Sequence, residues 1–212
     1  MTTSTVSGGR SVLLVAATEA EIAAVRPTPS GSGVRVLITG IGMVATAARC
    51  ARALAQGRFD FALNAGVCGA FDPTLPPGSV VHVVRDRIAE LGAEDGDAFL
   101  TMADIGLFAD SAFVNANPPD LAGLRELRPV HGITVNTVHG SEASIAAVVE
   151  RFHPQVESME GAAFMSACLD AGVPFAQVRA VSNVVERRDR SAWRLDEAIA
   201  ALAGAVDRIL QS

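Results

Sequence analysis

Tyrosine is absent from this chain, and aromatic residues of all kinds make up only 5% of it. The absence excludes a catalytic tyrosine and a binding surface built from tyrosine rings. Charged residues are also few, at 19%, and they give a net charge of −6 with no basic stripe. Because nucleic acids bind clustered basic side chains, we expect no nucleic-acid partner.

Cysteine is scarce as well, and its spacing matches no familiar framework. Cys50, Cys68 and Cys168 are odd in number and far apart, which fits neither a disulfide set nor a zinc site. We therefore expect buried thiols, a cytoplasmic protein and no bound metal. No apolar run has the length of a transmembrane helix and the N-terminus lacks a signal-peptide pattern, so no membrane partner is expected.

Apolar residues, in contrast, form 50% of the 212 residues, enough for a large buried core. Residues 1–10 are rich in serine, threonine and glycine and predict a flexible N-terminal tail. Residues 11–212 predict a single domain. Short apolar runs alternate with longer amphipathic stretches, which indicates an α/β fold with a sheet covered on both faces, that is, a three-layer α/β/α sandwich.

The pattern places these elements along the chain. Strands are expected at Val12–Ala17, Val34–Thr39, Phe61–Asn64, Ser79–Val84, Ile133–Val138, Val156–Met159 and Phe175–Ser182. Helices are expected at Glu19–Val25, Met43–Gln56, Pro119–Leu127, Ser141–Phe152, Glu160–Ala171 and Leu195–Ile209. The acidic segment from Gly92 to Gly106 predicts a long loop, a feature that is often functional.

One glycine-rich turn has several interpretations. The residues from Gly40 to Ala45 read G-I-G-M-V-A between a strand and a helix, which matches a dinucleotide fingerprint. The acidic residue expected at the end of the next strand is missing, because that strand ends at Asn64. Three interpretations of the turn remain. It is a plain strand–helix connection without a ligand, a sugar or anion site at a helix N-terminus, or the cofactor site of a dinucleotide-dependent oxidoreductase.

Four segments carry a family resemblance when they are taken in order: Ala16–Glu21, Asn64–Gly69, Glu157–Ala163 and Arg179–Asn183. Together they resemble the purine nucleoside phosphorylase and nucleosidase superfamily. The segment from Asp86 to Gly96 is similar to one hydrolase subfamily within it. The resemblance implies a central twisted mixed sheet, a small-molecule nucleoside substrate, no cofactor and a homodimer or higher homo-oligomer.

The resemblance also assigns roles to residues. Glu21 matches the carboxylate that activates water, Glu160 the carboxylate that binds the ribose hydroxyls, and Asn183 the residue that holds the purine. The remaining expected substrate contacts are Met159, Gly42, Gly66 and Val67. Simpler roles stay open: the two glutamates as acids that favour a helix dipole, Met159 as core and Asn183 as a turn residue.

Two departures from the superfamily narrow the reaction. Phosphorylases hold phosphate with an arginine and a serine near the positions of Asn64 and Val67, where this chain has an amide and an aliphatic side chain. A dianion would lack an anchor there, which favours water as the nucleophile. Adenine-cleaving relatives usually carry aspartate at the position of Asn183. An amide can donate to a 6-oxo group, so Asn183 favours hypoxanthine.

The similar subfamily acts on an inosine derivative with a carboxyphenyl ketone at its 5′ end. Arg187, Arg188, Arg190 and Trp193 follow Asn183, and an arginine fork suits a carboxylate while an indole stacks on a ring. A solvated basic loop is the alternative. The competing functions are a methylthioadenosine or adenosylhomocysteine nucleosidase, a phosphorylase, the oxidoreductase, and a nucleoside-binding module without catalysis.

Overall fold

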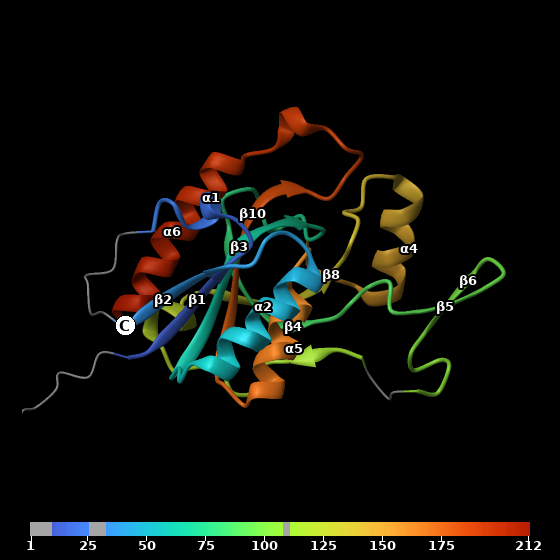
Figure 1. The fold of residues 1–212 in the computed structure, drawn as a ribbon. Helices are drawn as coiled ribbons and strands as arrows, with labels where there is room; N and C mark the ends of the chain where they lie inside the picture. The colour runs from blue at the N-terminus through green and yellow to red at the C-terminus, as the bar shows by residue number, and fades with distance from the viewer. Residues whose placement is uncertain (1–9, 26–32, 108–110) are drawn as a thin grey trace, which may run out of the picture.

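The computed structural model describes residues 10–25, 33–107 and 111–212, so the expected tail lies, except for Arg10, outside the described residues (Figure 1). An eight-stranded mixed sheet with helices around it forms the centre, which confirms the expected α/β fold. Its strands are β1 (Val12–Ala16), β2 (Val34–Ile38), β3 (Phe61–Ala70), β4 (Val80–Asp86), β7 (Phe113–Val114), β8 (Arg128–Thr134), β9 (Val156–Ser158) and β10 (Phe175–Val184).

The sheet partly closes on itself. Strands β2, β1, β3 and β10 are parallel neighbours, and β10 pairs antiparallel with β4. From β4 the pairing continues in parallel through β8 to β9, and β9 returns antiparallel to β3. Because β3 pairs with both β9 and β10, five strands form a ring, a partial barrel that a flat sandwich does not contain.

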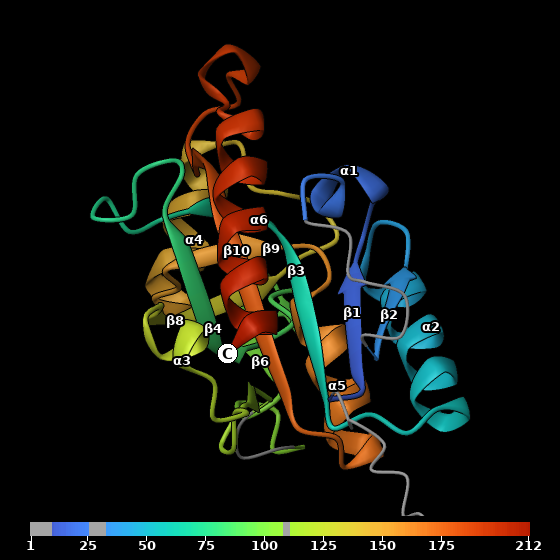
Figure 2. The ribbon, with the colours of Figure 1, turned by 90° about the vertical axis from the view of Figure 1, so that its left-hand side faces the viewer.

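Helices cover both faces of the open part of the sheet. On one face lie α1 (Glu19–Ile22), α3 (Ala122–Arg125) and α6 (Leu195–Gln211), and Figure 2 shows α6 in front of β10 and β3. On the other face lie α2 (Met43–Gln56) and α5 (Gly161–Ala171). Alternate residues of β1 separate accordingly, since Leu14 packs towards α6 and Leu13 towards α2 and α5. The remaining helix, α4 (Glu142–Phe152), packs near β8.

Several expected elements differ from the observed ones. The expected strand Ile133–Val138 is wrong in its bounds, because β8 begins at Arg128 and has exposed residues alternating with buried ones at its start. The expected helix Pro119–Leu127 is the single turn α3. The expected loop Gly92–Gly106 contains a hairpin of β5 (Gly92–Asp95) and β6 (Ala98–Thr101), which projects beside α4 in Figure 1.

Candidate active site

A cavity of about 320 Å³ opens at the carboxyl ends of the parallel strands β1, β3 and β10. Its size falls within the range of small-molecule sites, about 300–1,000 Å³. The walls come from segments far apart in the sequence: the start of α1, the end of β3, the β9–α5 junction and the chain after β10. The predicted residues that line it are Glu21, Val67, Met159, Glu160, Asn183 and Trp193.

The carboxylate of Glu21 is buried on α1 and held by donors of its own chain. Its Oε2 accepts hydrogen bonds from the backbone N–H of Thr18 (2.8 Å) and from the Thr18 hydroxyl (3.0 Å). Its Oε1 accepts from the backbone N–H of Val67 (3.2 Å) on β3. Because each carboxylate oxygen has two lone pairs, Glu21 can still accept a hydrogen bond from a ligand in the cavity.

A buried arginine lies behind this carboxylate. Arg179 on β10 is 1% exposed and donates through Nη2 to Oδ1 of Asn64 (2.5 Å). A Cβ atom on Gly66 would lie 2.6 Å from Nη1 of Arg179 and 2.8 Å from Oε1 of Glu21, so only glycine leaves room for both groups. Gly66 thus lies next to the cavity rather than in its wall. A charged residue in the middle of a strand that is buried along most of its length was the sequence feature that could have singled out Arg179.

The second predicted carboxylate, Glu160, is buried at the N-terminus of α5. Its Oε1 accepts from the backbone N–H of Gly42 (3.0 Å), which precedes α2. Gly42 has a φ of 95°, a conformation that favours glycine. The turn that resembles a dinucleotide motif therefore directs this N–H to the protein's own carboxylate, which counts against a bound pyrophosphate. Met159 lines the cavity directly before Glu160.

Asn183 lies near the end of β10, after an irregularity in its pairing with β3. Its Oδ1 accepts from the hydroxyl of Ser182 (2.8 Å), and its Nδ2 donates to the carbonyl of Val184 (2.8 Å). Cys68, which also lines the cavity, is no candidate nucleophile. Burial raises the pKa of its thiol to about 12, so the thiol stays protonated near neutral pH.

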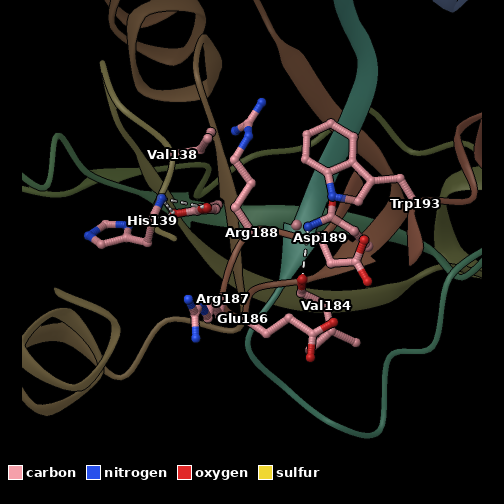
Figure 3. Close-up of a pocket in the computed structure, with 11 residues that line it drawn as sticks. Val138, His139, Val184, Glu186, Arg187, Arg188, Asp189 and Trp193 are labelled. Carbon is pink, nitrogen blue, oxygen red and sulfur yellow. Dashed lines mark hydrogen bonds and ion pairs between the residues drawn. The ribbon is translucent and has the colours of Figure 1, made fainter. Parts of the chain in front are cut away.

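A smaller hollow of about 40 Å³ adjoins the main cavity and shares Asn183 and Trp193 with it (Figure 3). Arg187 and Arg188 line this outer hollow, and the guanidinium of Arg188 lies 5.4 Å from the centre of the Trp193 ring system. Arg190 lines neither space and begins a short 3₁₀ turn (Arg190–Ala192). The structure thus favours Arg187 and Arg188 over Arg190 as site residues.

A pair formed by a half-buried histidine and a buried carboxylate lies where the two spaces meet. Glu157 on β9 is 4% exposed, and one of its oxygens lies 2.6 Å from Nδ1 of His139. The backbone N–H of His139 also donates to the carboxylate (3.2 Å). Both residues border the outer hollow, where Figure 3 shows His139 across from Trp193. Neither residue was predicted to have a role, although a glutamate in an apolar segment beside the Met159–Glu160 pair is visible in the sequence.

Within residues 10–25, 33–107 and 111–212, His, Cys, Asp and Glu side chains form no group of three or more that could hold a metal ion. No helix in the described part of the chain has the length and apolar character needed to cross a bilayer.

Two buried carboxylates, an amide and an apolar wall at the ends of parallel strands form the kind of site that cleaves a nucleoside. The family model described as "Phosphorylase superfamily" matches residues 16–211, and the chain belongs to that superfamily. A futalosine hydrolase of Streptomyces coelicolor is 39% identical over 82% of this chain and 77% of its own length. One of Thermus thermophilus is 36% identical over 85% and 82%. Within the superfamily, the chain therefore belongs to the futalosine hydrolase family.

Solved structures share the fold at lower sequence identity. A 5′-methylthioadenosine/S-adenosylhomocysteine nucleosidase of Colwellia psychrerythraea, in complex with adenine, has a TM-score of 0.79 at 22% identity and covers 96% of both chains. A futalosine hydrolase of Helicobacter pylori has a TM-score of 0.79 at 16% identity and covers 96% of this chain and 98% of its own. At these identities the match supports the fold alone.

Proposed function

We propose that this protein hydrolyses the N-glycosidic bond of futalosine and releases hypoxanthine and dehypoxanthine futalosine, a step of menaquinone biosynthesis. The observation that carries the proposal is that Glu21, Glu160 and Asn183 line the same cavity in a member of the futalosine hydrolase family. No step of this reaction requires a metal or an organic cofactor.

The chemistry divides between the two ends of the scissile bond. As the bond breaks, positive charge builds on the ribose and the electron pair passes to the purine. Glu160 accepts hydrogen bonds from the ribose hydroxyls, Met159 packs against the sugar, and Glu21 takes a proton from the water that attacks C1′. Asn183 donates to the purine and stabilises the negative charge that develops there. The departing purine takes up one proton from solvent, which balances the proton that Glu21 accepts from the attacking water.

The surroundings of Glu21 support water as the nucleophile. The amide of Asn64 is engaged at both ends, since its Nδ2 donates to the carbonyl of Val15 and its Oδ1 accepts from Arg179. Val67 contributes only its backbone N–H, and that N–H already binds Glu21. A phosphate dianion would therefore find neither a free cation nor a hydroxyl at these two positions.

The chain after β10 supports a place for the 5′ arm of futalosine. Trp193 lines both spaces and offers a ring on which the carboxyphenyl group can stack, and Arg188 lies against the same ring system. Of the arginines predicted to bind the distal carboxylate, Arg187 keeps this role in the proposal beside Arg188, while Arg190 lines neither space and is left out of the proposal.

The proposal also concerns organisation and location. Residues 11–212 form one nucleosidase domain, copies of the chain assemble into a homo-oligomer, and the protein is located in the cytoplasm. Ile41, which lines the cavity, is 65% exposed, and Val44 on the next turn is 80% exposed. A second copy of the chain would cover these exposed apolar side chains at the cavity rim, which supports the proposed homo-oligomer. Three free, buried cysteines suit a reducing compartment.

The test is incubation of the purified protein with futalosine in phosphate-free buffer, with chromatography of the products. We expect hypoxanthine and dehypoxanthine futalosine at a rate that added phosphate does not change. A requirement for phosphate, with a ribose 1-phosphate product, would contradict the hydrolase. Methylthioadenosine is the comparison substrate, and its faster cleavage would favour the methylthioadenosine-type nucleosidase instead.

A further inference from the structure

The proposed mechanism leaves one buried carboxylate of the cavity wall without a role. Glu157 borders the main cavity as well as the outer hollow, and it is as deeply buried as Glu21 and Glu160. Burying a carboxylate is costly unless hydrogen bonds compensate for lost water. Two donors of His139 provide part of this compensation. An ionised carboxylate has about four acceptor sites, so capacity remains for a donor in the cavity.

Glu157 and Asn183 approach each other over one glycine. A Cβ atom on Gly69 would lie 3.4 Å from Nδ2 of Asn183 and 3.6 Å from Cγ of Glu157. A side chain that carries N–H donors and a side chain that carries only acceptors therefore both border Gly69 in the wall of the cavity. Any flat ligand whose edge reaches this place meets a donor next to an acceptor.

The edge of a 6-oxopurine complements this arrangement. Its O6 accepts and the adjacent N1–H donates, whereas adenine presents the reverse, an amino donor beside an N1 acceptor. We propose that Glu157 accepts a hydrogen bond from N1–H of hypoxanthine while Asn183 donates to O6, so that Glu157 is a second determinant of base specificity. This inference rests on the proposed function and extends it to the recognition of the base.

His139 acts through Glu157 as a positioning residue. Its ring and its backbone N–H both donate to the carboxylate, which fixes the Nδ1–H tautomer and the orientation of Glu157. The ring of Phe71 meets the His139 ring edge to face at 6.1 Å and holds it in place. The backbone contact would survive substitution of the side chain, so loss of the imidazole should loosen the carboxylate without removing it.

The experiment measures calorimetric binding of three free bases, hypoxanthine, 1-methylhypoxanthine and adenine. The native protein should bind hypoxanthine at least about tenfold more tightly than either of the others, since a lost hydrogen bond to a buried charge corresponds to roughly that factor or more. In Glu157→Gln the hypoxanthine-to-adenine ratio should fall by about tenfold, because the amide can donate to N1 of adenine. An unchanged ratio would overturn the proposal.

Two comparisons separate a hydrogen bond from crowding or lost charge. A purely steric penalty for the N1 methyl group would persist in Glu157→Gln, whereas a lost hydrogen bond predicts a smaller penalty there. Glu150→Gln removes an exposed carboxylate from α4, outside both spaces, and should leave all ratios unchanged. If Glu157→Gln fails to fold, equal binding of hypoxanthine and its 1-methyl derivative by the native protein still overturns the proposal.

The positioning role has its own readout. His139→Ala should reduce the hypoxanthine-to-adenine ratio, and His139→Asn should restore part of it, because the asparagine N–H can take the place of Nδ1–H. A role in stability alone would not move this ratio. Binding needs no turnover, so the outcomes are distinct: Glu157-dependent preference without cleavage of futalosine contradicts the proposed function, and cleavage without that preference contradicts this inference.

Discussion

At the scale of single residues, Glu21 has the most direct test. Glu21→Gln keeps the size of the side chain, and the amide carbonyl can still accept from Thr18, but an amide cannot take a proton from water. We expect futalosine binding within a few-fold of native and a kcat lower by roughly 10²–10⁴-fold. Glu19→Gln, an exposed carboxylate on the same helix, is the control. Native kcat in folded Glu21→Gln would remove Glu21 from the mechanism.

Asn183 is expected to set the preference between 6-oxo and 6-amino purines. In Asn183→Asp the side chain loses its donors, and a carboxylate placed against O6 leaves two acceptors face to face. Sites that bind a polar group can discriminate by about 10⁴–10⁵-fold when the bond is lost, and one substitution delivers part of that. We expect kcat/KM for futalosine to fall relative to aminodeoxyfutalosine. An unchanged ratio of the two values would mean that Asn183 does not contact the base.

Site residues could be predicted from the sequence where they belong to a recognisable motif. They could not be predicted where only the fold brings two distant residues into contact. Glu21, Glu160, Met159 and Asn183 line one cavity, as the sequence predicted for a shared site, although their catalytic roles stay predictions. The pair of His139 and Glu157 spans 18 positions of the chain, and nothing local relates the two. Their contact depends on how the chain before α4 passes over β9.

At the scale of elements, helices with sharp end signals were predicted best. The bounds of α2 were predicted residue for residue, because glycines flank it at both ends. Strand β3 continues past the predicted end at Asn64 to Ala70. Glycine and alanine are poor strand formers, yet here they allow β10 to pair along the same segment, so tertiary pairing overrides local propensity.

The segment between β10 and α6 should determine selectivity for the 5′ arm. Arg188→Ala and, to a smaller extent, Arg187→Ala should lower kcat/KM for futalosine more than for inosine, because only futalosine carries the distal carboxylate. We expect about tenfold for Arg188, the range of a charge-assisted hydrogen bond. Arg190→Ala, outside both spaces, is the matched control. Equal losses on both substrates would show that neither arginine binds that group.

At the scale of the whole molecule, ring closure was beyond prediction from the sequence. Periodicity indicates which faces are buried but not that β3 has partners on both β9 and β10. Closure also depends on tight approaches: a Cβ atom on Gly161 would lie 2.2 Å from Oδ2 of Asp86 and from Nε2 of Gln177. The start of α5, which carries Glu160, therefore packs closely against the interior of the ring.

Asp86 links the parts of this interior. Its Oδ1 accepts from the hydroxyl of Thr134 (3.0 Å) and its Oδ2 from Nε2 of Gln177 (2.9 Å), which join β4 to β8 and β10. Thr134 in turn accepts from the backbone N–H of Ala162 (2.7 Å) on α5. Burial raises the pKa of Asp86 from 3.8 to about 6, although the hydrogen bonds from Gln177 and Thr134 favour its charged form.

This raised pKa makes the contribution of Asp86 to stability depend on pH in a defined direction, opposite to that of His82, whose pKa burial lowers from 6.5 to about 4. The folded state binds the Asp86 proton more tightly than the unfolded state does, so its contribution to stability is complete below about pH 4 and is lost as the pH rises towards 6. The change from 3.8 to about 6 corresponds to roughly 3 kcal/mol in the free energy of unfolding. Above pH 6 this contribution no longer changes.

Asp86→Asn should therefore abolish that fall. Asparagine is neutral throughout, and its carbonyl can accept from Thr134. Its amide N–H would meet the Nε2 donor of Gln177, so the Gln177 amide must flip to present Oε1, which has no hydrogen-bond partner among the described residues. Urea unfolding at pH 4, 5, 6 and 7 should show that the free energy of unfolding of the native protein, relative to that of the variant, declines between pH 4 and 6. The opposite contribution of His82 is common to both proteins and cancels in this difference. Asp170→Asn, at the exposed end of α5, should keep the native pH profile. A difference between Asp86→Asn and the native protein that does not change with pH would contradict this role of Asp86.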